Sequence, residues 1–157
     1  MSREDVYNAV VGSFSMYGGL LKDVADAIGM EGAMALHGKQ GTHFGTMVAG
    51  AIQAHLGGAE VNIEAVTKII SGMTDGFGMH PEVEMTPTSV SFSHVNCPIY
   101  DGLKMAGWEH HEIEEACSCM AGAEVEEITK AFPQLSGEVA FRTTADAPCV
   151  ERFFLEA

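Results

Sequence analysis

Cys97 carries the strongest chemical signal in this chain, because of its place in the segment Ser-His-Val-Asn-Cys-Pro-Ile-Tyr. An alternating, strand-like pattern ends before it, and a helical pattern begins after it with Pro98 at the first position, which suits the fixed φ of proline. Cys97 is therefore predicted to cap the helix, beside free backbone N–H groups and the positive end of the helix dipole. Such surroundings lower the pKa of a thiol and favour the thiolate that attacks carbon or binds metal. The alternative interpretation is a small buried residue at the end of a strand.

Two histidines are candidate partners for this cysteine. His94 lies three residues before Cys97 on the apolar face of the expected strand, where it would be the base that activates the thiol. His110 lies near the start of a later helix and is the second candidate acid or base. The alternatives are a hydrogen-bonded core histidine at 94 and a polar helix start at 110. The side chains expected to line a substrate pocket are Cys149, Glu124 and Phe92.

The four cysteines all lie in the last 61 residues. Cys117 and Cys119 fall in one predicted helix and are about 200° apart around its axis, so they should face different surroundings. Cys117 is expected to face inward, on the same side as His110 and Glu124, while Cys119 is expected to be dispensable. The alternative for Cys117 is a core cysteine flanked by two polar groups.

A second hypothesis uses the cysteines as metal ligands. Cys97, Cys117 and Cys149 would supply three sulfurs for zinc or another thiophilic metal, and the fourth ligand would be Glu138, Glu151 or a histidine. No Cys-X2-Cys pair and no His-Glu-X-X-His motif supports it. A third hypothesis is an interaction protein whose reduced cysteines are purely structural.

Charge and length limit the class of protein. The chain has 157 residues, of which 46% are hydrophobic, and is expected to form one globular domain over 1–157. With 8 Lys and Arg against 22 Asp and Glu, its net charge of −14 argues against nucleic acid and anionic membranes as partners. No signal peptide and no apolar run of about 18 residues is visible, so we expect a cytoplasmic protein with reduced thiols. A small-molecule ligand is the expected partner, and a homo-oligomer is left open.

Hydrophobic periodicity predicts that residues 1–75 are mainly helical. Apolar side chains recur at helical spacing over 6–14, 20–28 and 44–56. Gly29 is the expected end of the second helix, and Gly57 and Gly58 are the expected end of the third. Asn62 is the expected cap of a further helix. No linker separates this part from the rest.

Residues 85–157 are predicted to form a cysteine-bearing α+β half. Val90, Phe92 and His94 share one face of a strand, and a short helix after Pro98 and a longer one over 110–132 follow. Residues 137–144 and 149–156 are expected to form a closing hairpin. The predicted fold class is α+β, with N-terminal helices packed on a small antiparallel sheet.

The second half resembles the L-2-amino-thiazoline-4-carboxylate hydrolase family. The matching features are Val-Asn-Cys-Pro-Ile, an Ala-Gly about ten residues on, an inward cysteine in the next helix, Phe-Pro-Gln-Leu, and a hairpin ending in cysteine before an aromatic strand. The firm part of the match covers 90–156, with Met120 where the family often has Asp. A weaker resemblance is to 4-vinyl-reductase-type small-molecule-binding domains, which can hold zinc.

The family resemblance implies a hydrolase that opens a small cyclic amidine or amide ring at a cysteine-centred site. It carries over Cys97, Cys117 and Cys149. Cys97 would be the nucleophile, His94 or His110 the acid and base, and Cys149 part of the pocket wall. The alternative expectation is a small-molecule sensor whose cysteines bind zinc or another thiophilic metal.

Overall fold

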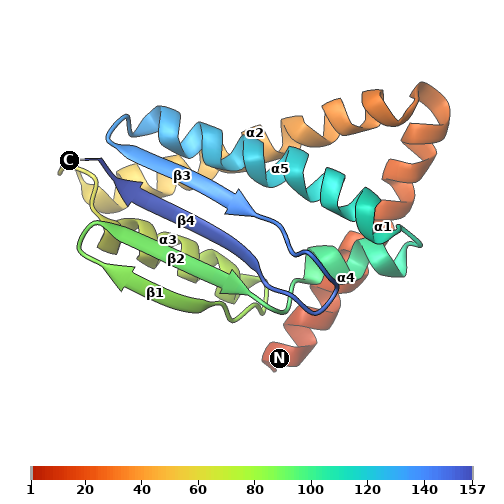
Figure 1. Ribbon diagram of the computed structural model, residues 1–157, viewed down its shortest axis with the longest axis horizontal. Helices are drawn as coiled ribbons and strands as arrows, with labels where there is room; N and C mark the ends of the chain where they lie inside the picture. The colour runs from red at the N-terminus through yellow and green to blue at the C-terminus, as the bar shows by residue number, and fades with distance from the viewer. Residues whose placement is uncertain (1, 157) are drawn as a thin grey trace.

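The computed structural model describes residues 2–156 and has an α+β fold, as predicted (Figure 1). A four-stranded antiparallel sheet has helices on one face, while its other face is turned toward the viewer in Figure 1. The helices are α1 (Arg3–Ile28), α2 (Met30–Leu56), α3 (Ile63–Gly76), α4 (Pro98–Met105) and α5 (His110–Ala131). The strands are β1 (Glu82–Thr86), β2 (Ser89–His94), β3 (Leu135–Ala140) and β4 (Cys149–Leu155).

The first two predicted stripes belong to one continuous helix, α1. Gly18 lies inside it because its missing side chain leaves room for α4, and the Trp108 indole donates a hydrogen bond of 3.0 Å to the Gly18 carbonyl. Gly29 ends α1 at a φ of 85°, a conformation that favours glycine. The predicted cap is also present, since Asn62 Oδ1 accepts a hydrogen bond of 2.9 Å from the Ala65 amide.

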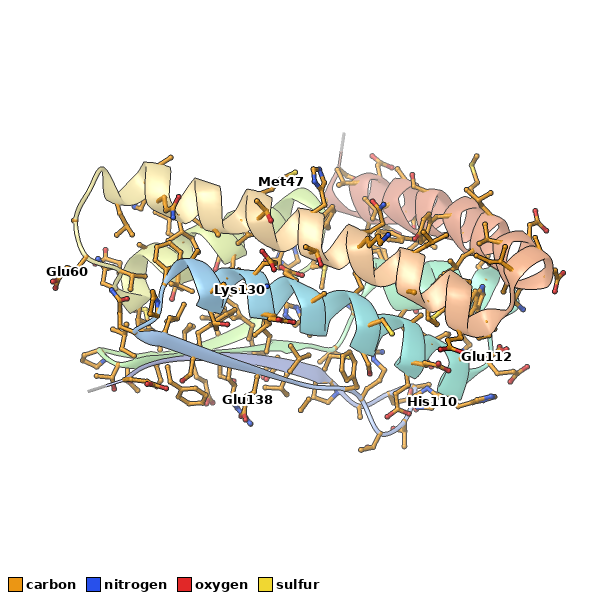
Figure 2. The ribbon with its side chains drawn as sticks, turned by 90° about the horizontal axis from the view of Figure 1, so that it is seen from above. Met47, Glu60, His110, Glu112, Lys130 and Glu138 are labelled. Carbon is orange, nitrogen blue, oxygen red and sulfur yellow. The ribbon has the colours of Figure 1, made fainter. Side chains whose placement is uncertain are left out.

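Helix α2 starts at Met30, well before the predicted stripe, because its middle packs through glycines rather than large apolar side chains. A Cβ atom at Gly41 would collide with the Met120 carbonyl of α5, and one at Gly45 would lie 2.5 Å from the Glu124 carbonyl. Figure 2 shows α5 between α2 and the sheet. The close contact with α2 leaves the opposite side of α5 free to face the sheet.

The sheet order is β1-β2-β4-β3. In the pairing of β2 with β4, His94 lies opposite Cys149, Phe92 opposite Glu151 and Val90 opposite Phe153. The face predicted for β2 is therefore correct, since all three of its residues are buried there.

Two strand predictions were wrong. Strand β1 was not expected. Its five residues are all exposed at the sheet edge, so the sequence has no alternation of buried and exposed residues that would predict a strand there. The hairpin strand β3 runs over Leu135–Ala140 instead of 137–144. Residues 141–148 form a loop instead, because Arg142 turns into the protein.

Two hydrophobic clusters hold the layers together. One joins the sheet to α2, α3 and α5 around Phe92 and Phe153, and the other joins α1, α2, α4 and α5 around Leu103 and Ile113. Within residues 2–156, no helix combines the length and the apolar character needed to cross a bilayer.

Candidate functional site

A cavity of about 130 Å³ lies between the sheet and the helices. Most of its lining is apolar. The exceptions that could do chemistry are three thiols, one imidazole and two carboxyl groups, namely Cys97, Cys117, Cys149, His94, Glu124 and Glu151. They come from the start of α4, from α5 and from the facing strands β2 and β4. The site thus brings together cysteines that are up to 52 positions apart in the sequence.

The sheet contributes a histidine and a cysteine that are direct neighbours across β2 and β4. His94 and Cys149 form one register pair, and the Cβ atoms of such a pair lie about 4.5–5.5 Å apart. The His94 Nε2 atom lies 3.9 Å from a Glu151 carboxylate oxygen. His94 is only 8% exposed, and its Nδ1 atom has no hydrogen-bond partner in the described part of the chain. This imidazole is therefore held beside a thiol with one ring nitrogen still to be satisfied.

Phe92 does not line the cavity, contrary to expectation. It is fully buried in the hydrophobic core, opposite Glu151, and its ring stacks on His94 with 6.4 Å between the ring centroids. Phe92 packs against the His94 imidazole, because residues two positions apart on a strand lie on the same face of the sheet.

Cys97 is the residue before α4, and Pro98 is the first helical position, as predicted. The amides of Ile99 and Tyr100 favour its thiolate, as expected at a helix N-terminus. Burial of the sulfur outweighs them, however, and raises the pKa of Cys97 above its ordinary value. The predicted lowering of this pKa was wrong because local sequence indicates the helix start but not the depth at which it lies.

Cys117 and Cys119 face different surroundings, as the helical angle predicted. Cys117 lines the cavity with Cys97, whereas Cys119 is absent from its lining. Burial raises the pKa of Cys117, and the nearby Cys97 and Cys149 raise it further. Both Cys97 and Cys117 are therefore thiols at neutral pH.

His110 is not among the residues that line the main cavity. A smaller hollow next to the cavity is lined by His110 together with Cys97, Cys117 and Cys149. The Tyr100 hydroxyl and His110 Nδ1 are 2.9 Å apart and share a hydrogen bond. His110 is consequently near the thiols but outside the main cavity.

Arg142 belongs to the candidate site, and the sequence analysis missed it. It is a charged side chain with only 5% exposure, and its Nε donates a hydrogen bond of 3.4 Å to the Cys149 sulfur. Its guanidinium carbon lies 4.4 Å from the centre of the Tyr100 ring, a cation–π geometry. A guanidinium donor at a sulfur stabilises negative charge there.

The remaining donors of Arg142 bind backbone oxygens. They reach the carbonyls of Ala145 at 3.0 Å, His94 at 3.2 Å and Val95 at 3.1 Å. One side chain thereby fastens the 141–148 loop to the end of β2 and sets the position of Cys149. Nothing near position 142 in the sequence indicates these partners, since the two carbonyls of 94 and 95 lie 48 and 47 residues away.

Glu124 enters the cavity from α5, as expected. Burial raises its pKa from 4.5 to about 8, and the charge of Glu151 adds to the rise. Glu124 is therefore mainly a neutral acid at pH 7, able to donate a proton.

The three cysteines share a cavity without forming a metal-ligand set. Among residues 2–156, no group of three or more His, Cys, Asp or Glu side chains is arranged to hold a metal ion. Glu138, one of the expected fourth ligands, is exposed on β3 and pairs with Arg152 at 3.0 Å instead.

Comparison with known proteins gives no further guide to this site. No family model matches the chain, and no curated protein matches it either.

Proposed function

We propose that the protein is a cysteine hydrolase that opens the ring of a small cyclic amidine or amide. The observation that carries the proposal is the placement of Cys149 between the Arg142 guanidinium and the His94 imidazole at the wall of a mostly apolar cavity. The motif resemblance to the L-2-amino-thiazoline-4-carboxylate hydrolase family supports the same reaction class.

Two contacts favour Cys149 over Cys97 as the attacking residue. The Cys149 sulfur accepts a hydrogen bond from a guanidinium, and its register neighbour is a histidine that Glu151 can orient. A nucleophile, a base and a group that orients the base are the parts that cysteine catalysis needs. Cys97 has the helix N-terminus in its favour, but burial raises the pKa of its thiol above the ordinary value.

The proposed reaction proceeds in two halves. His94 takes the thiol proton, and the Cys149 sulfur forms a bond to the ring carbon that carries the doubly bonded nitrogen or oxygen, while the π electrons of that double bond move onto the nitrogen or oxygen. The double bond then re-forms as the ring carbon–nitrogen bond breaks, and the leaving nitrogen takes the proton from His94. In the second half, His94 removes a proton from water and the oxygen bonds to the same carbon. The carbon–sulfur bond then breaks, and the departing Cys149 sulfur takes the proton back from His94.

The two carboxyl groups divide their roles because their surroundings differ. Glu151 lies next to His94 and would stabilise the imidazolium that forms when the thiol loses its proton. Glu124, held neutral by burial, is a second proton donor for the leaving nitrogen. Cys97 and Cys117 line the wall as neutral thiols.

A panel of single cysteine variants tests this function. Purified protein is incubated with small cyclic amidines and amides, and ring opening is followed as the gain of one water in the product mass. Cys149→Ser should abolish turnover, while Cys97→Ser should retain a measurable rate and Cys119→Ser should match wild type. Turnover by Cys149→Ser at the wild-type rate would show that Cys149 is not the nucleophile. If turnover is lost in Cys97→Ser alone, Cys97 is the nucleophile instead.

The metal-binding hypothesis keeps one point in its favour, which is that three cysteines line the same cavity. Their side chains would have to move together to become ligands, because the described residues form no such set. Metal analysis of protein purified without chelator separates the two functions. One bound zinc per chain that survives EDTA would favour the sensor, and metal-free protein that opens the ring would favour the hydrolase.

A further inference from the structure

We propose that the cavity selects ligands with a cationic nitrogen head, such as an amidinium, on an apolar body, and that it excludes carboxylates. This inference names the substrate class of the site described above and rests on the proposed function only for what happens after binding. Three observations carry it: the charge of the lining, an unpartnered nitrogen, and an apolar groove that continues from the cavity.

The charge of the lining is acidic. Glu124 and Glu151 both line the cavity, and no lysine or arginine is among the described residues that do so. Arg142, the nearest cation named above, lines only the adjoining hollows, and its donors are already used by Cys149 and three carbonyls. A bound carboxylate would face the Glu151 carboxylate and find no lysine or arginine in the lining, whereas an amidinium can donate to Glu151 and favours ionisation of Glu124, whose pKa of about 8 is close to neutral pH.

His94 supplies an independent indication of a ligand that donates hydrogen bonds. Its Nε2 atom faces the Glu151 carboxylate at 3.9 Å, which favours a proton on that nitrogen. Nδ1 is then an acceptor, and this atom is buried with no partner in the described chain. A buried acceptor without a partner is costly, and His94 is one of the residues that line the cavity, so a ligand N–H that reaches this nitrogen would remove the cost. A carboxylate offers no such hydrogen.

An apolar groove extends the cavity toward α1 and α2. Four side chains line both spaces: Phe44, Phe77, Ile99 and Met120. The groove adds about 260 Å³ and is lined further by Tyr17 and by Met47, which Figure 2 places on α2. The cavity alone is close in size to the roughly 150 Å³ apolar cavity that holds a benzene ring. The cationic head of a ligand therefore fits in the cavity beside the two carboxyl groups, and its apolar body extends into the groove.

This charge pattern separates the chain from the family that it resembles. The substrate for which that family is named carries a carboxylate in addition to its amidine-like ring. Here such a group would lie near Glu124 and Glu151. The lining of this cavity therefore favours cyclic amidines without an acid group.

Three probes of nearly equal shape test the inference by calorimetry. Benzamidine is cationic, benzamide neutral and benzoate anionic, so a difference among them reports charge and hydrogen-bond donors rather than size. Benzamidine should bind at least tenfold more tightly than benzamide, and benzoate should not bind. Benzoate binding as tightly as benzamidine would overturn the inference.

Matched variants locate the effect. Glu124→Gln and Glu151→Gln should each weaken benzamidine binding at least tenfold and leave benzamide binding unchanged. Glu60→Gln removes the same charge from an exposed loop at one end of the molecule in Figure 2, at a residue that is not part of the cavity lining, and should change nothing. If the two cavity variants behave like Glu60→Gln, the inference is wrong.

The binding test is independent of catalysis. Ring opening of cyclic amides without any preference for benzamidine would overturn the inference and leave the hydrolase intact. Selective benzamidine binding without turnover by any cyclic substrate would do the reverse.

Discussion

Glu124→Gln should make the protein more stable at alkaline pH and almost unchanged at acidic pH. The carboxyl is buried in the cavity, and its pKa rises from 4.5 to about 8 because of burial and the Glu151 charge. In the unfolded chain it ionises near its ordinary value. Between pH 4.5 and 8 the folded state therefore holds a proton that the unfolded state has lost, and stability falls as the pH rises.

The magnitude follows from the size of the pKa change. Each pKa step of one corresponds to about 1.4 kcal/mol, so this group destabilises the wild type by at most about 5 kcal/mol at pH 8 and above. Glutamine has nearly the same shape and no charge, and it removes that term. The difference in unfolding free energy between variant and wild type should therefore grow from near zero at pH 4.5 to several kcal/mol at pH 8, and then level off.

Urea unfolding at pH 4.5, 6, 7, 8 and 9 measures this difference. The comparison with Glu60→Gln controls for net charge. The titratable groups that face Glu124 in the cavity are Glu151 and Cys149 of β4, His94 of β2, Cys97 before α4 and Cys117 of α5. They are present in both proteins, so the difference between the two stability curves reports Glu124 together with its interaction with the Glu151 charge. Parallel stability curves for Glu124→Gln and wild type across this range would refute the reasoning.

Three further predictions concern packing and the arginine. Gly41→Ala should lower the unfolding free energy by about 3 kcal/mol, because the new Cβ atom would collide with the Met120 carbonyl. Gly50→Ala in the same helix places its Cβ atom in open space and should raise the unfolding free energy by about 0.5–1 kcal/mol. Thermal unfolding measures both changes. Arg142→Lys keeps the charge but cannot reach four acceptors, so urea unfolding should show a loss of about 2–3 kcal/mol, and an unchanged midpoint would contradict the fastening role. Cys119→Ala should stay within about 0.5 kcal/mol of wild type in the same assay, and a larger loss would place Cys119 in the core.

Local patterns predicted much of the site. The change from alternating to helical spacing located both the end of β2 and the cap at Cys97, and alternation alone assigned His94 to the buried face. Helical angles separated Cys117 from Cys119. These predictions succeeded because each depends on a few neighbouring residues whose backbone geometry fixes the direction of the side chain.

The features that could not be predicted from the sequence depend on contacts between residues that are distant along the chain. Arg142 lies in a segment predicted as strand, and its role appears only when the loop meets the end of β2. The pKa values of Cys97 and Glu124 depend on burial that α2, α5 and the sheet create together. Strand β1 was missed because an exposed edge strand carries no hydrophobic alternation.

Alkylation of the native protein at pH 7, read by peptide mass mapping over time, tests most directly that Cys149 is the reacting thiol. With limiting iodoacetamide, Cys149 should be modified first, ahead of Cys119, which lies outside the cavity. Arg142→Lys should slow the modification of Cys149, whereas Arg152→Gln, a change at an exposed arginine on the same strand as Cys149, should not. Modification of Cys119 before Cys149, with the same rates in both arginine variants, would contradict the account.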